Sequence, residues 1–158
     1  MTIYIKDFLK SPDVQDMINI NNFIGVYAAC PMNMRGYLTD TLIAAHIDPC
    51  LYFCNGETIA WMFYHGNDIK EYSVPNNISY INMDTFAFSD SLRKIILPKS
   101  IKMIDDSSFF LSSVTEIIYL GSKEDFKTIA IHSRAFYKSS ITSIQCCDGS
   151  IEISSLYS

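Results

Sequence analysis

The sequence predicts an α+β protein in which a short repeat solenoid follows a small α+β N-terminal region. Two segments of the chain resemble each other, and the distance between them is the distance from Pro75 to Pro98. Apolar residues stand at the same positions in both segments. The chain has 158 residues, of which 49% are hydrophobic, enough to bury a core. Within each copy, residues expected in the core alternate with residues expected on the surface, and this alternation indicates short strands.

The repeats are clearest between residues 69 and 113, where each copy has one proline followed by apolar residues at fixed distances. The matched pairs are Pro75 and Pro98, Ile78 and Ile101, Ile81 and Ile104, and Phe86 and Phe109. A period of roughly 20–29 residues with apolar positions in register is typical of a leucine-rich-repeat solenoid. A third copy starts at Val114 with an insert at 121–129, and a partial fourth copy covers 141–147. We therefore expect three to four repeats in residues 69–158 and a capping region in residues 1–68.

The capping region does not fit the repeat, so its elements are predicted from local signals. Ser11 followed by Pro12 and Asp13 indicates a helix start, and that helix is expected to run to about Asn19. The other expected elements are strands at 2–5 and 23–27, a loop at 31–36, a short buried helix at 41–46, and a hairpin of residues 51–54 and 58–64 around Asn55-Gly56. At the other end of the chain, residues 151–153 are expected to form a last short strand.

The repeat pattern resembles the bacterial BspA-type leucine-rich repeat. The second copy has the pattern at Leu92, Ile95, Leu97, Pro98, Ile101, Ile104, Ser108 and Phe109, and the first copy at Ile69, Tyr72, Val74, Pro75, Ile78, Ile81 and Phe86. The insert, with Gly121-Ser122 before Phe126 and Ile129, is similar to a variant repeat of that family. The resemblance covers roughly residues 69–147. It implies a scaffold and no particular site, and members of the family are typically large, secreted surface proteins.

Candidate binding residues follow from the alternation of side chains along each strand. Core positions are expected at Tyr72, Val74, Ile95, Leu97, Ile117, Tyr119, Ile144 and Cys146. The residues between them should form two columns on the open sheet face, the first of Glu71, Lys94, Glu116 and Ser143, the second of Ser73, Ile96, Ile118 and Gln145, with Leu120 nearby. An apolar patch rimmed by charge marks an interaction site more often than chance does. The open alternative is that the insert or the N-terminal region folds over this patch.

Charge and hydropathy narrow the class of partner. The net charge is −5, and no run of lysine or arginine exceeds two residues, which disfavours direct binding of nucleic acid. An acidic surface suits a basic protein partner, such as a nucleic-acid-binding enzyme. The sequence shows no signal peptide and no membrane span, so we expect a cytoplasmic protein that does not bind membranes.

Metal and catalytic chemistry finds little support in the sequence. His46, Cys50, Cys54 and His65 lie near one another along the chain, but they lack the close cysteine pair usual in zinc sites. The vicinal Cys146-Cys147 is expected to place one thiol in the core and one outside. We therefore expect no metal, no cofactor and no catalytic residue.

These observations favour a non-catalytic protein-binding module. In its sharpest form the hypothesis is an inhibitor from a phage or mobile element that binds a bacterial defence protein, as anti-CRISPR proteins do. Two alternatives stay open: a structural or adhesive repeat fragment, and a metal-dependent enzyme in the N-terminal region.

Overall fold

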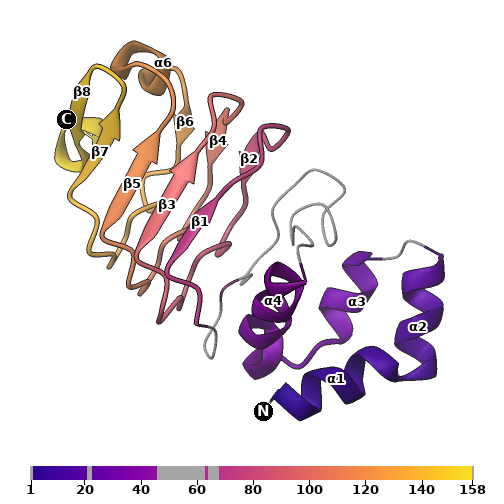
Figure 1. Ribbon diagram of the computed structural model, residues 1–158. Coiled ribbons are helices and arrows are strands. Elements are labelled where there is room, and N and C mark those ends of the chain that lie inside the picture. The colour runs from indigo at the N-terminus through magenta and orange to yellow at the C-terminus, as the bar shows by residue number, and fades with distance from the viewer. Residues whose placement is uncertain (1, 21–22, 46–62, 64–67, 158) are drawn as a thin grey trace.

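The computed structural model describes residues 2–20, 23–45, 63 and 68–157, and it separates a helical part from a solenoid (Figure 1). The described N-terminal part consists of α1 (Thr2–Lys10), α2 (Pro12–Asn19), α3 (Phe23–Ala29), the 3-10 helix η1 (Met32–Met34) and α4 (Arg35–Ala44). These helices share a small hydrophobic cluster, which contains Ile5, Val14, Val26, Tyr27, Cys30, Leu38 and Leu42. Within the described residues, no helix is both long and apolar enough to cross a membrane.

The two strands predicted in this region are wrong. Residues 2–5 belong to α1 and residues 23–27 to α3. A short apolar run fits a buried helical turn as well as a buried strand. Apolar residues three and four positions further along the chain indicate the helix. In α1, Phe8 and Leu9 follow the buried Ile5 by three and four positions and pack into the same cluster.

The remaining N-terminal predictions had mixed outcomes. The helix from Pro12 to Asn19 is confirmed, with Ser11 at its N-cap. The loop predicted at 31–36 is wrong, because η1 lies there and α4 already begins at Arg35. Of the helix predicted at 41–46, residues 41–44 form the end of α4, which starts earlier than predicted, and residue 46 lies outside the described residues. The predicted hairpin lies outside the described residues, apart from Phe63.

The predicted leucine-rich-repeat solenoid is confirmed, and it is built from two sheets. The larger sheet has the strand order β1 (Glu71–Ser73), β3 (Lys94–Leu97), β5 (Glu116–Tyr119), β7 (Ser143–Cys146) and β8 (Gly149–Glu152). The smaller sheet has the order β2 (Tyr80–Ile81), β4 (Met103–Ile104) and β6 (Ala130–Ile131). Strands from successive repeats pair in parallel, and β8 alone in this set runs antiparallel, to β7. The expected strand at 151–153 is thus β8, which ends at Glu152, and the 3-10 helix η2 (Ile153–Tyr157) follows it.

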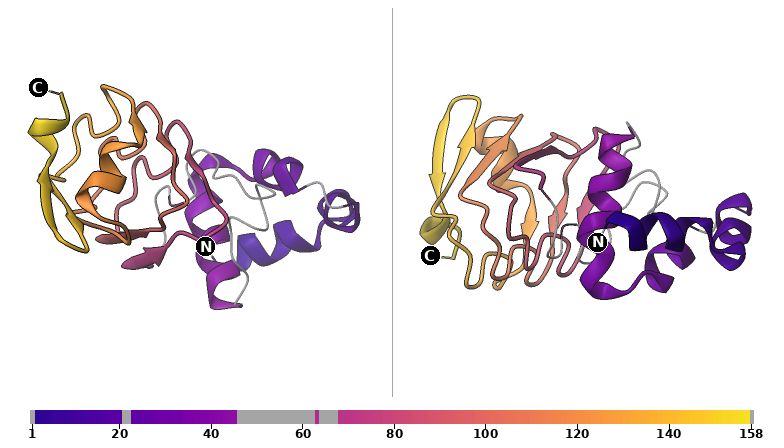
Figure 2. Two further views of the ribbon diagram at one scale, coloured as in Figure 1. Left: turned by 90° about the horizontal axis from the view of Figure 1, so that it is seen from above. Right: turned by 60° about the horizontal axis from the view of Figure 1, so that its bottom comes forward.

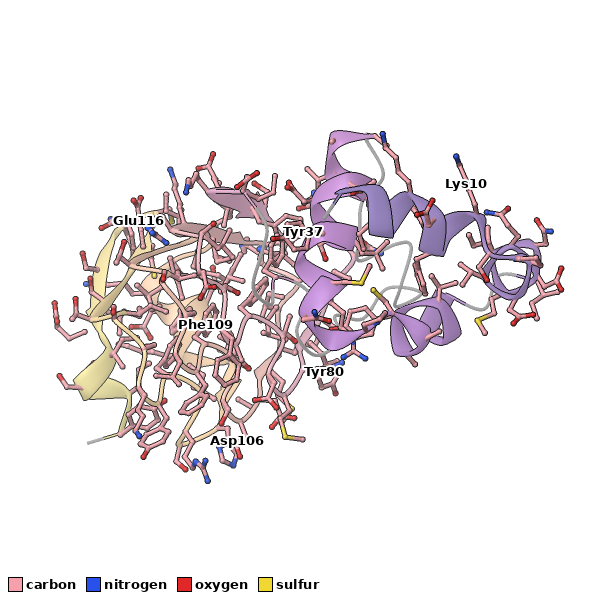
Figure 3. The ribbon with its side chains drawn as sticks, turned by 90° about the horizontal axis from the view of Figure 1, so that it is seen from below. Lys10, Tyr37, Tyr80, Asp106, Phe109 and Glu116 are labelled. Atoms are coloured by element: carbon pink, nitrogen blue, oxygen red, sulfur yellow. The ribbon has the colours of Figure 1, made fainter. Side chains whose placement is uncertain are left out.

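Repeated aromatic residues stack through the solenoid core. Phe86, Phe109 and Phe136 stand at equivalent positions, with ring centroids 5.4 Å and 5.5 Å apart. Phe63 extends this stack toward the N-terminal end, with its ring centroid 5.7 Å from that of Phe86. In the sequence, the spacing from Phe63 to Phe86 equals the spacing from Phe86 to Phe109. Figure 3 shows Phe109 inside the solenoid, with Glu116 on one side and Asp106 on the other. The repeat spacing therefore places identical side chains on top of one another along the solenoid axis.

Helix α4 lies beside the first turn of the solenoid (Figures 1 and 2). The side chain of Ile43 packs against the solenoid core rather than the helical cluster. The backbone N–H of Asp68 donates a hydrogen bond to the Asp40 carboxylate at 3.3 Å. Both contacts attach the end of α4 to the start of the repeats.

Candidate functional site

The five-stranded sheet presents an outer face, here called the open face, on which the two predicted columns are in register. Glu71 pairs with Lys94 and Lys94 with Glu116 across β1, β3 and β5. In the second column Ser73 pairs with Ile96, Ile96 with Ile118, and Ile118 with Gln145. All eight predicted core positions between them are buried, which confirms the predicted alternation.

The first column is held together by charge. The Lys94 ammonium lies 3.0 Å from the Glu71 carboxylate and 3.8 Å from that of Glu116. Its hydrogen bond to Glu71 raises the pKa of Lys94, and the nearby negative charges raise it further. One lysine therefore lies between two carboxylates, and this part of the open face keeps an excess of negative charge.

The second column provides the apolar part of the open face. Ile96 and Ile118 are half-buried on adjacent strands, and each occupies the same place in its repeat. Leu120 stands at the end of β5, where the preceding repeats have Pro75 and Pro98, and is 53% exposed. Its backbone N–H donates to the Leu97 carbonyl at 3.0 Å, so its position is fixed by the sheet.

The insert forms α6 (Lys123–Lys127) at the carboxyl ends of the strands (Figure 1). Ser122 and Asp125 form a capping box at its start, and the bonds from the Ser122 backbone and hydroxyl lower the pKa of Asp125. Asp125 also lies 3.4 Å from the Lys99 ammonium, which follows β3. The side chain of Phe126 points inward, with its ring centroid 5.2 Å from that of Tyr119.

Gly121 makes this sharp entry into α6 possible. A Cβ atom at residue 121 would lie 2.6 Å from the Tyr119 ring, closer than such atoms approach in folded proteins. The glycine-serine pair noted in the sequence therefore has a packing reason, since only glycine leaves room for the tyrosine.

Two further residues join the open face through β8 and were missed in the sequence. Glu152 pairs with Ser143 in the first column, and Ser150 pairs with Gln145 in the second. A last strand was predicted at 151–153, but the pair Asp148-Gly149 between two short apolar runs is a hairpin signal that could have revealed its antiparallel pairing with β7. Glu152 adds a third carboxylate to the first column.

The described residues include no group of three side chains suited to hold a metal ion. His46, Cys50, Cys54 and His65 lie outside the described part, so the structure does not place them. Cys146 is buried and Cys147 exposed, as the alternation predicted. Burial raises the pKa of the Cys146 thiol, which favours its protonated, less reactive form.

The family model described as BspA type Leucine rich repeat region (6 copies) matches residues 57–157. The chain belongs to this family. The BspA-type match starts before the first repeat predicted at residue 69 and includes Phe63, which lies in the repeat core. Neither the curated proteins nor the solved structures gave a match.

Membership in the BspA-type family supports a protein-interaction or adhesive repeat module. A leucine-rich-repeat solenoid is typically a non-catalytic scaffold, and specificity comes from the side chains placed on it. Binding through Glu71, Ser73, Lys94, Ile96, Glu116, Ile118, Leu120 and Gln145 stays a prediction, as does the boundary between residues 68 and 69.

Proposed function

We propose that this chain is a non-catalytic module that binds a basic protein through the open face. The main supporting observation is the register of the two columns, which sets the adjacent Ile96 and Ile118 beside Lys94 and its flanking carboxylates. Interfaces commonly combine an apolar centre with a charged rim. Leu120 extends the apolar centre toward the carboxyl ends of the strands.

The negative charge of the open face favours binding to a partner with a basic surface. Glu71, Glu116 and Glu152 outnumber the single lysine of the first column, and the whole chain carries a net charge of −5. Opposite charge speeds encounter and suppresses wrong partners more than it adds affinity. A partner surface with lysine or arginine around an apolar centre would complement this arrangement.

In its most specific form the proposal is an inhibitor encoded by a phage or mobile element that acts in the bacterial cytoplasm. Its target would be a defence enzyme with a basic nucleic-acid channel, because the acidic open face could occupy such a channel. The net charge of −5 supports this form of the proposal.

The test is affinity capture from bacterial lysate with three baits, read by mass spectrometry. The baits are the wild type, Ile118→Glu on the open face, and Leu111→Glu as a control on a solenoid turn. Leu111 is 47% exposed, so the control adds the same charge away from the proposed site. We expect one basic protein to be held by the wild type and the control and lost with Ile118→Glu.

Retention of the same partner by all three folded baits would exclude the open face as the site. A partner without a basic surface would exclude the charge argument. If the partner is a housekeeping protein, and the chain inhibits no nucleic-acid-dependent defence system, the inhibitor form is wrong and the general binding role remains. Self-association without any other partner would favour the structural or adhesive alternative.

A further inference from the structure

The smaller sheet stops two strands short of the larger one at the C-terminal end of the solenoid. The larger sheet continues past β5 with β7 and β8, whereas in the described part of the chain the smaller sheet ends at β6. β6 therefore has β4 on one side and an open edge on the other. An open strand edge can pair with an extended segment of another protein.

The register of the repeats identifies the backbone atoms at this edge. The carbonyl of Lys102 accepts a hydrogen bond from the Ala130 N–H, and that of Ile104 accepts one from the His132 N–H, both at 2.9 Å. The register gives two sets of equivalent carbonyl groups along β2, β4 and β6. The first set is Ser79, Lys102 and Ile129, and the second, two residues further along each strand, is Ile81, Ile104 and Ile131. In β6 the acceptors that would serve a following strand are thus the carbonyls of Ile129 and Ile131.

A cavity of about 320 Å³ lies at the same edge. Its lining comes from the insert, β6, β8 and η2. The apolar residues are Phe126, Ile129, Ile131, Ile151 and Leu156, and the polar ones are Lys127 and Ser155. The Tyr157 hydroxyl donates to the His132 carbonyl at 3.2 Å, which attaches η2 to the end of β6 without using either edge acceptor. The volume is at the lower end of the range for ligand pockets, roughly 300–1,000 Å³, and suits one apolar side chain with its adjoining backbone.

We propose that β6 and this cavity form a second binding site, for an extended apolar peptide segment of a partner protein. The peptide adds a parallel strand to β6, donates two backbone N–H groups to Ile129 and Ile131, and inserts one apolar side chain into the cavity. The existing pair of β4 and β6 defines the chemistry of the peptide. At each strand of this sheet an isoleucine packs in or against the core, fully buried at Ile81 and Ile104 and partly buried at Ile131, and the hydrogen-bond spacing is the same. This site lies away from the open face and does not depend on the function proposed for it.

The chain itself supplies a suitable probe. A blocked synthetic peptide with the sequence of residues 99–106 contains β4, the strand that pairs with β6 inside the solenoid. In this peptide the N–H groups of Met103 and Asp105 correspond to those of Ala130 and His132, and Ile104 is the inward side chain. Calorimetric titration of the full chain with this peptide should show saturable one-to-one binding.

Three modified peptides separate strand pairing from simple apolar contact. N-methylation at both Met103 and Asp105 removes the two donors and is expected to weaken binding at least about tenfold. N-methylation at Ile104, whose N–H faces the other way in a strand, is the matched control and should have little effect. The change Ile104→Glu should weaken binding, because a carboxylate would replace the isoleucine that packs against Ile131, Ile151 and Leu156.

Variants of the protein locate the site. Leu156→Lys places a charge in the cavity wall and should weaken peptide binding at least about tenfold. Met83→Lys, at a 54% exposed position on the first repeat, is the matched control and should bind like the wild type. Amide chemical-shift changes in the wild type should gather in residues 126–132 and 151–157.

The absence of saturable binding by the unmodified peptide would overturn the proposal. Equal binding of the peptide methylated at Met103 and Asp105 would also overturn it, because the cavity would then take apolar groups without strand pairing. If Leu156→Lys does not fold, the peptide modifications and the shift map still decide the outcome on the wild-type protein.

Discussion

The negative charge of Asp84 lowers the stability of the folded chain. It adopts a left-handed backbone conformation, with φ of 60°, in the turn after β2, and its N–H donates to the Asp106 carbonyl. Burial raises the pKa of Asp84, the negative charge of Asp106 raises it further, and Arg134 partly opposes both. The ionised carboxylate is therefore less favourable in the folded chain than in the unfolded chain.

The change Asp84→Asn should raise the melting temperature at pH 7. Asparagine tolerates the left-handed conformation, and it removes both the partly buried charge and the repulsion from Asp106. Because the folded-state pKa of Asp84 is raised, the advantage of the variant is full at neutral pH. It shrinks as the pH falls through that pKa toward the ordinary aspartate value of about 3.9, where wild-type Asp84 becomes protonated.

The matched control is Asp7→Asn, which makes the same charge change at an exposed position on α1. Thermal unfolding followed by circular dichroism between pH 3 and pH 7 compares the three proteins. A melting temperature for Asp84→Asn at or below that of the wild type at pH 7 would show that Arg134 compensates fully for the burial of the charge.

Single elements were predictable where they repeat and unpredictable where they do not. The alternating positions of β1, β3, β5 and β7 followed from the sequence, because each copy confirms the register of the others. The apolar runs that became α1 and α3 have no second copy, and a few apolar residues do not distinguish a helix from a strand. The two columns could be derived from the same repetition, whereas the cavity at β6 could not, because it depends on where η2 packs.

The capping box of α6 should make a measurable contribution to stability. Its Ser122 hydroxyl accepts the Asp125 N–H at 3.0 Å, and the Asp125 carboxylate accepts the Ser122 N–H at 3.0 Å. Ser122→Ala removes the first bond and should lower the free energy of unfolding by about 1 kcal/mol, measured by urea denaturation at pH 7. Lys127→Ala, which removes only an exposed ion pair with Glu124, is the control and should change stability less.

Acid titration gives an independent check on this capping box. Because the folded-state pKa of Asp125 is lowered, its contribution is present above the unfolded aspartate value and is lost as the pH falls through the folded-state pKa. That acid-side loss should be smaller in Ser122→Ala, since part of the cause of the lowered pKa is gone. An unchanged acid profile would mean that the backbone N–H of residue 122 and Lys99 stabilise the carboxylate without the hydroxyl.

At the scale of the whole molecule, the described residues form two hydrophobic cores, and α4 contributes to both. Leu38 and Leu42 pack in the helical cluster, whereas Ile43 on the same helix packs against the solenoid core. The end of a solenoid exposes an apolar face unless another element covers it. We therefore propose that the N-terminal helices cap the repeats, and that α4 provides the covering contact.

The change Ile43→Asp tests this capping role. It should lower the free energy of unfolding by about 1–3 kcal/mol, because a charge would lie against the end of the repeat core. Ile20→Asp, at a position 73% exposed, makes the same chemical change away from the solenoid and should have little effect. Hydrogen exchange shows where stability is lost: faster exchange in β1 and β3 than in β7 would follow from an uncovered first repeat. If exchange instead becomes faster only in α1–α4, and equally in all four helices, the helices fold as a separate unit. The solenoid would then be stable without a cap.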